Sequence, residues 1–248
     1  YRPSLLESSR TKMFYAVFNT PQNGIPGSAV CAFTVNDILK SFEGPFKEQK
    51  TSHSSWLPVK DVETPTPHPA RTCANDSMAL SDQTLNFIRG HPLMDQAVPA
   101  FGGSPIISQA SFDYRMTQIA VDWQIKASDD RYYDVLFIGT DDGRVIKAIN
   151  KGHGTRIETV TVEHIQVFTD KAPIINLQIY RKDNVEKLVV IGQDQIKAIP
   201  LARCQIRITC GQCVGLQDPY CSWNKDKDQC DQSKYGIQSV DTGRHSSC

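Results

Sequence analysis

The cysteines are distributed very unevenly along this chain of 248 residues, because six of the eight lie after residue 203. These six are Cys204, Cys210, Cys213, Cys221, Cys230 and Cys248. A segment as short as 204–248 cannot bury enough apolar surface to fold on a core alone, and dense cysteines are typical of secreted modules held by disulfides. We therefore expect two domains, a large one over residues 1–203 and a small disulfide-rich module over residues 204–248.

Zinc is the alternative use of these cysteines. Cys210 and Cys213 have the spacing of metal ligands, and His245 with Cys248 completes a possible set of four. Zinc would leave the other three cysteines of the module without a role, whereas an even number of six can pair completely. The residues therefore favour disulfides, but spacing alone allows fifteen pairings.

The charge and hydropathy patterns exclude several classes of function. The 27 basic and 27 acidic side chains cancel, which argues against a nucleic-acid arm and a polybasic membrane surface. The apolar runs are far shorter than the roughly 20 residues that span a bilayer. The histidines are scattered, and the sequence contains no Gly-x-Ser-x-Gly motif. The sequence thus predicts no catalytic residue, no metal site and no cofactor.

A strand–turn–strand segment occurs twice in the large domain. Residues 135–149 contain Ile-Gly-Thr-Asp and Ile-Lys-Ala-Ile, and residues 188–199 contain Ile-Gly-Gln-Asp and Ile-Lys-Ala-Ile. A weaker copy covers residues 13–33. A repeat of about 50 residues with about four strands favours a β-propeller, although a β-sandwich, which needs no repeat, is the alternative. Because two or three blades cannot close a propeller, we expect further blades before Tyr1.

Local patterns add detail to these strands. Asp142-Gly143 predicts a two-residue hairpin turn in which both residues have positive φ. Further strands are expected at residues 116–123 and 159–168. In the first of these, Ile119, Val121 and Trp123 alternate with smaller or polar residues, which predicts a half-buried strand with these three on its apolar face.

The repeat pattern is interrupted between residues 35 and 111. Two short helices are expected there, at residues 36–42 and 82–89, with several prolines between them. Asn75-Asp76-Ser77 within this stretch is an acceptor for N-glycosylation, which favours an extracellular protein. An insertion of this length in a repeat protein is usually functional or forms an interface.

Three runs of sequence, residues 84–95, 113–122 and 134–143, resemble the semaphorin family and occur in that family's order. The cysteine spacing of the tail, with Asp218-Pro219-Tyr220-Cys221-Ser222-Trp223 inside it, resembles the plexin–semaphorin–integrin (PSI) module of the same proteins. The resemblance covers almost the whole chain. It is greatest to the invertebrate transmembrane semaphorins of class 1.

This resemblance implies a fold, a function and partners. The fold would be all-β, the last blades of a seven-bladed sema β-propeller followed by the PSI module. Semaphorins are extracellular ligands at the cell surface, mainly repulsive axon-guidance cues, which dimerise and cluster plexin receptors. The expected partners are therefore a plexin, a second copy of the protein and the upstream part of the sema domain. The family's plexin-binding face lies largely on blades that would precede Tyr1.

The resemblance also assigns individual residues. The implied PSI disulfides are Cys204–Cys221, Cys210–Cys248 and Cys213–Cys230. Cys31 and Cys73 would pair with cysteines upstream of Tyr1 rather than with each other. The dimer contact is expected in the interruption at residues 35–111, where Arg89 and His91 flank the end of the second helix.

Two other functions compete with a semaphorin ligand. Plexin-like receptors also join a sema propeller to a PSI module, so a receptor ectodomain is the nearest alternative. A propeller glycosidase is the alternative from a different class, but the clustered Arg, Glu and Tyr residues that it needs are not evident in these blades.

Overall fold

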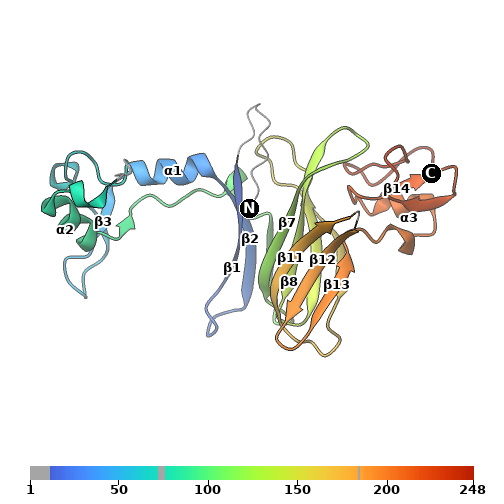
Figure 1. Cartoon of the computed structure of the whole chain (residues 1–248), viewed down its shortest axis with the longest axis horizontal. Coiled ribbons are helices and arrows are strands. Elements are labelled where there is room, and N and C mark those ends of the chain that lie inside the picture. The colour runs from blue at the N-terminus through green and yellow to red at the C-terminus, as the bar shows by residue number, and fades with distance from the viewer. Residues whose placement is uncertain (1–11, 72–75, 184) are drawn as a thin grey trace. The chain divides into compact units, whose positions relative to one another are not determined.

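The computed structural model describes residues 12–71, 76–183 and 185–248, and most of their regular structure is β-strand (Figure 1). The chain forms two compact units. Of the described residues, the insertion unit comprises 12–14 and 33–103, and the blade unit comprises 15–32 and 104–248. The predicted interruption at 35–111 therefore corresponds closely to a separate unit.

The first repeated hairpin lies at the centre of an antiparallel four-stranded sheet. Its strands are β7 (Met116–Lys126), β8 (Tyr132–Thr140), β9 (Arg144–Asn150) and β10 (Thr159–Gln166), in the spatial order β10-β9-β8-β7. Because β9 has a neighbour on each side, its backbone groups are paired along both edges. The sheet is consistent with a complete propeller blade.

The second repeated hairpin belongs to a three-stranded sheet, in the order β11-β12-β13. The strands are β11 (Ile174–Lys182), β12 (Val185–Gly192) and β13 (Ile196–Pro200), and β13 forms one edge. The two sheets share one hydrophobic core. Its fully buried members include Val135, Phe137, Val145, Ile149, Phe168, Ile174, Leu188 and Val190.

The turn between β8 and β9 differs from the predicted one. It contains three residues, Asp141, Asp142 and Gly143, and of these only Gly143 has a positive φ, of 81°. The Asp142 side chain accepts a hydrogen bond from Thr140 Oγ1 at 2.6 Å and pairs with Arg144. These side-chain bonds hold Asp142 in an ordinary conformation, so glycine alone supplies the left-handed residue.

The faces of β7 are also the reverse of the prediction. Asp122 is 2% exposed and Ala120 is buried, whereas Trp123 is 48% exposed and Ile119 and Val121 are only half-buried. The Asp122 carboxylate is buried because Arg181 and Tyr220 both bond to it. Partners far away in sequence therefore determine which side of this strand is covered.

The weaker copy of the repeat is the hairpin of β1 (Met13–Asn19) and β2 (Gly27–Thr34), which is joined by β6 (Ile107–Ala110) in the order β1-β2-β6. Gly27 pairs with Ala110 and Val30 with Ile107. The chain therefore leaves this sheet after β2 and returns to the strand position beside β2.

The insertion unit contains both expected helices, which confirms those predictions. Helix α1 (Val35–Glu43) is capped by Thr34, and α2 (Asp82–Gly90) is capped by Ser81, whose hydroxyl accepts from the Thr84 N–H at 3.2 Å. A small sheet has the order β4-β3-β5, from β4 (Leu57–Pro58), β3 (Phe46–Glu48) and β5 (Leu93–Met94). The 3₁₀ turns are η1 (Asp61–Glu63), η2 (Ser77–Ala79) and η3 (Phe101–Gly103).

The cysteine-rich module has a core of its own within the blade unit. Its elements are η4 (Cys204–Ile206), α3 (Cys210–Gly215), β14 (Ser222–Asn224) and β15 (Gln229–Asp231). The core residues are Cys204, Cys213, Val214, Leu216, Cys221, Trp223, Cys230 and Ile237. In the described part of the chain, no helix has both the length and the apolar composition needed to cross a membrane.

Candidate functional site: interaction surfaces

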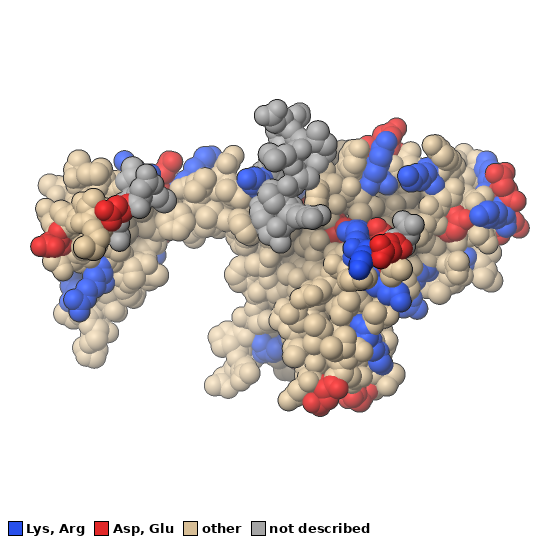
Figure 2. All heavy atoms as spheres, in the orientation of Figure 1, with Lys and Arg blue, Asp and Glu red and all other residues tan. Residues whose placement is uncertain are grey.

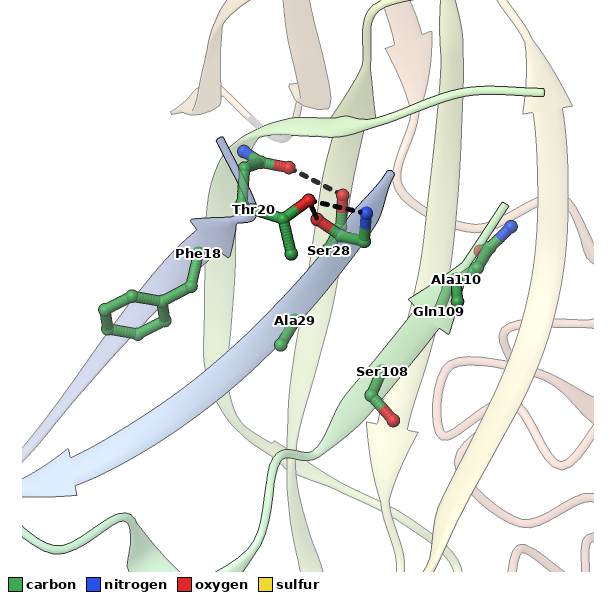
Figure 3. Close-up of a pocket in the computed structure, with 9 residues that line it drawn as sticks. Phe18, Thr20, Ser28, Ala29, Ser108, Gln109 and Ala110 are labelled. Atoms are coloured by element: carbon green, nitrogen blue, oxygen red, sulfur yellow. Dashed lines mark hydrogen bonds between the residues drawn. The ribbon is translucent and has the colours of Figure 1, made fainter. Parts of the chain in front are cut away.

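The described residues contain no group of three or more His, Cys, Asp or Glu side chains that could hold a metal ion. Acidic and basic side chains are interspersed on the face shown in Figure 2. An open pocket lies on the β1-β2-β6 sheet, where Phe18, Ser28 and Ser108 are among the lining residues (Figure 3). No residue lining this pocket is titratable.

Four aromatic rings form a continuous stack in the insertion unit. His68 stacks on Phe46 with a centroid distance of 5.2 Å, Phe46 meets Phe87 edge-to-face at 5.1 Å, and Phe87 stacks on His91 at 4.1 Å. Phe46 belongs to β3 and is 5% exposed, whereas Phe87 belongs to α2. Phe87 therefore fixes α2 to the small sheet.

The structure places the two predicted dimer residues in different environments. His91 is part of the ring stack, its Nδ1 lies 2.7 Å from the Phe87 carbonyl oxygen, and its side chain is 19% exposed. Arg89 is exposed and has no hydrogen-bond or ion-pair partner among the described residues. The two side chains differ because the helix ends at Gly90 and the following turn directs the His91 imidazole onto Phe87. A dimer contact at Arg89 and His91 stays a prediction.

An apolar face accompanies Arg89 on α2. Leu85 is 44% exposed and Ile88 is 40% exposed, and residues 85, 88 and 89 lie on one side of a helix. Nearby in the unit, Leu93 on β5 is 48% exposed. We call Leu85, Ile88 and Arg89 the α2 face. An arginine beside exposed apolar side chains is a composition that protein interfaces favour.

The six cysteines of the tail form three disulfides in the structure. They are Cys204–Cys221, Cys210–Cys248 and Cys213–Cys230, which are the pairs that the family resemblance implies. No cysteine of this module remains as a thiolate for zinc. Four of the six sulfurs belong to residues of the module's core, so the bridges replace part of the apolar surface that a short segment lacks.

The remaining predicted modification sites are only partly within the described residues. Cys31, on β2, is a half-buried free thiol, and burial raises the pKa of that thiol. Cys73 and Asn75 lie outside the described residues. The glycosylation of Asn75 and the pairing of Cys31 and Cys73 with upstream cysteines therefore stay predictions.

A buried ion pair joins the cysteine-rich module to the blades. The Lys147 ammonium on β9 bonds to Asp218 in the module and donates to the Leu201 carbonyl at 2.9 Å. The two side chains are 1% and 4% exposed, and the Tyr220 ring lies 4.4 Å from the ammonium. Burial lowers the pKa of Lys147, whereas Asp218 opposes this change by stabilising the charged form.

A second polar contact lies at the same junction. Asp122 on β7 accepts hydrogen bonds from the Tyr220 hydroxyl and from Arg181 on β11. Gln238 in the module accepts from the backbone N–H of Ser128 at 2.7 Å. The sequence gives no signal of this junction, because the motif Ile-Lys-Ala-Ile carries a buried lysine at residue 147 and an exposed one at residue 197.

Comparison with known proteins identifies the family of this chain. The chain belongs to the Sema domain family, whose model matches residues 3–181. It is 46% identical to Semaphorin-1A of Drosophila melanogaster over 97% of this chain, which corresponds to 29% of that protein. The prediction of a class 1 semaphorin resemblance is thereby confirmed.

Solved structures support the fold. Drosophila Semaphorin 1a, extracellular domains 1–2, aligns with a TM-score of 0.87 and 46% identity over 99% of this chain and 51% of that one. Drosophila Semaphorin 1b in a structure with Plexin A aligns with a TM-score of 0.81 and 41% identity, over 96% and 47%. The predicted all-β fold of propeller blades with a disulfide-rich module is confirmed. The chain spans about half the length of these solved chains.

Proposed function

We propose that this chain is part of an extracellular semaphorin ligand that binds a plexin receptor. The observation that carries this proposal is the 41% identity, over 96% of the chain, to a semaphorin solved with Plexin A. Its location would be the cell surface, and its action repulsive axon guidance. The ligand signals by geometry rather than by chemistry, so it needs no catalytic centre.

Binding to cells tests the proposal and separates it from the receptor alternative. The ectodomain that contains this chain is added to cells that express a class A plexin and, in parallel, to cells that express a semaphorin. We expect binding to the plexin cells alone. Capture of semaphorin instead would indicate a plexin-like receptor, and glycosidase turnover by the purified ectodomain would support the hydrolase alternative.

The second part of the proposal is that the ligand acts as a homodimer. A dimer that binds one receptor makes its second binding step intramolecular, so a modest single-site affinity suffices to cluster two plexins. The α2 face supports a contact in the insertion unit, because Leu85, Ile88 and Arg89 are exposed together. His91 would act there only by holding α2 through its stack on Phe87.

Charge reversal tests the α2 face. We expect Arg89→Glu to weaken dimerisation about tenfold or more in sedimentation, the effect of about 1.4 kcal/mol. Lys60→Glu is the matched control, since Lys60 is exposed in the same unit without a partner among the described residues. An unchanged dimer constant for Arg89→Glu would place the contact elsewhere.

The third part concerns covalent links to the upstream sema segment. We propose that Cys31 and Cys73 each bond to a cysteine before Tyr1, and the free thiol of Cys31 in the structure is compatible with this pairing. Cleavage of the ectodomain near Tyr1 should then leave both pieces joined on a non-reducing gel. A fragment that runs free would favour a Cys31–Cys73 bridge.

A further inference from the structure

The insertion unit has a very small hydrophobic core. Among its described residues, the buried apolar side chains are only Phe46, Val59 and Pro65. The ring stack extends this core, and both of its ends are histidines, His68 and His91. Since histidine gains its charge near neutral pH, the packing of this unit depends on groups that acid can charge.

The His68 end of the stack is unfavourable for a positive charge. Arg71 on the same loop contributes a positive charge near the imidazole, while Asp61 on η1 and the Gly44 carbonyl act in the opposite sense. Burial is the larger cause and the charge of Arg71 the smaller one, and together they lower the pKa of His68 despite these opposing groups. His68 Nδ1 also accepts a hydrogen bond from the Ala70 backbone N–H at 3.3 Å, and a proton on this nitrogen would remove the acceptor.

The His91 end has a different environment. Its Nε2 lies 4.0 Å from the carboxylate of Glu48 on β3, and Lys50 lies 3.3 Å from the other oxygen of the same carboxylate. A proton on His91 would therefore face an acidic partner.

We propose that the insertion unit is an acid-labile element, in which His68 is the sensor and α2 is the part that loosens. A proton on His68 places a cation against the ring of Phe46, in the repulsive field of Arg71, and Phe46 is the residue against which Phe87 holds α2. The stability that neutral His68 contributes is complete above its ordinary pKa of about 6.5 and is lost as the pH falls below it.

This inference deepens the proposed function by adding a regulation to it. Because the α2 face carries the proposed dimer contact, loosening of α2 in acid would separate the dimer. The ligand would then cluster receptors at neutral pH and release them in an acidic compartment. This last step rests on the proposed function, whereas the acid lability of α2 does not.

Hydrogen exchange of the α2 amides tests the inference in the ectodomain that contains this chain. Protection factors, corrected for the intrinsic effect of pH, are compared at about pH 7.4 and about pH 5.5. We expect a loss of about threefold or more for α2 and none for β8 and β9. His68→Phe keeps a ring in the stack but cannot be protonated, so it should abolish the loss. His53→Gln, at an exposed histidine of the same unit, should leave it unchanged.

Three outcomes would contradict the inference or part of it. An acid response of α2 that persists in His68→Phe would overturn the role of His68. If that variant fails to fold, NMR titration of the unaltered protein decides, and a His68 that titrates at or above the exposed His53 would overturn it too. If α2 loosens in acid but the dimer constant stays the same, the role of His68 is supported and the dimer contact lies elsewhere.

Discussion

The two copies of the repeated hairpin have the same central motif but different environments. Lys147 in the first copy is 1% exposed and paired with Asp218, whereas Lys197 in the second copy is exposed and donates to the Val167 carbonyl at 2.8 Å. The difference comes from outside the hairpins. Strand β10 and the cysteine-rich module cover the first copy, while β13 lies at the edge of its sheet. One sequence motif thus serves as a buried anchor in one place and as a surface strand in the other.

The largest expected effect is the loss of the buried ion pair. Lys147→Met leaves Asp218 buried without a counter-charge, which should lower the free energy of unfolding by about 3–5 kcal/mol in urea titration. Lys197→Met is the matched control, and it should cost about 1 kcal/mol or less because the lysine is exposed.

The double variant Lys147→Met with Asp218→Leu shows whether the cost arises from losing the ion pair or from leaving Asp218 buried and unpaired. It removes both charges and should recover most of the lost stability. Equal costs for the single changes at Lys147 and Lys197 would show that the two hairpins are equivalent after all.

The turns of the two hairpins should also respond differently. Gly143 has a φ of 81°, and a Cβ at this position would lie 2.8 Å from the carbonyl oxygen of Phe168. We expect Gly143→Ala to cost about 2–4 kcal/mol from backbone strain and overpacking, as measured by thermal unfolding. Asp194→Ala, in the exposed turn of the second hairpin, should cost about 0.5 kcal/mol or less. Similar losses of stability for the two variants would show that the turn at Gly143 is no more constrained than the turn at Asp194.

A smaller effect is expected at the junction beside the first hairpin. Tyr220→Phe removes one of the two side-chain donors to Asp122 and should cost about 1–3 kcal/mol. Burial, together with the charge of Asp122, raises the pKa of Tyr220 above its ordinary value of about 10. The folded state therefore keeps a proton that the unfolded state loses, so stability falls as the pH rises above about 10.

The same variant tests this alkaline loss. Urea titrations near pH 8 and near pH 10.5 should show a shallower decline for Tyr220→Phe than for the unaltered chain. Tyr15→Phe is a useful comparison, because Tyr15 also donates to an aspartate, Asp134 at 2.6 Å, but lies outside the cysteine-rich module. An identical decline with and without Tyr220 would exclude this tyrosine as the source.

The local features of the fold could be predicted from the sequence because their causes are local. Helix α1 follows from the cap at Thr34 and the stop at Gly44-Pro45, and the hairpins follow from alternating strands around a turn. The family resemblance added the disulfide pairs, which spacing alone does not determine.

The features that were missed depend on partners far away in sequence. Asp122 is buried by Arg181 and Tyr220, which are 59 and 98 positions away, so no pattern within β7 could reveal its face. Lys147 is buried by Asp218 at a separation of 71. His91 turns inward because Phe87 packs there on Phe46, a contact between a helix and a strand that periodicity does not encode.

The pairing of β2 with β6 has a consequence for how the protein can vary. The chain leaves the sheet after β2 and re-enters it on the neighbouring strand, and adjacent strands are only about 4.8 Å apart. The ends of the insertion are therefore held together by the blade whatever its length, and the entropic cost of closing such a loop grows only slowly as residues are added. We therefore expect that the insertion can be lengthened, shortened or exchanged while the strand order β1-β2-β6 stays the same.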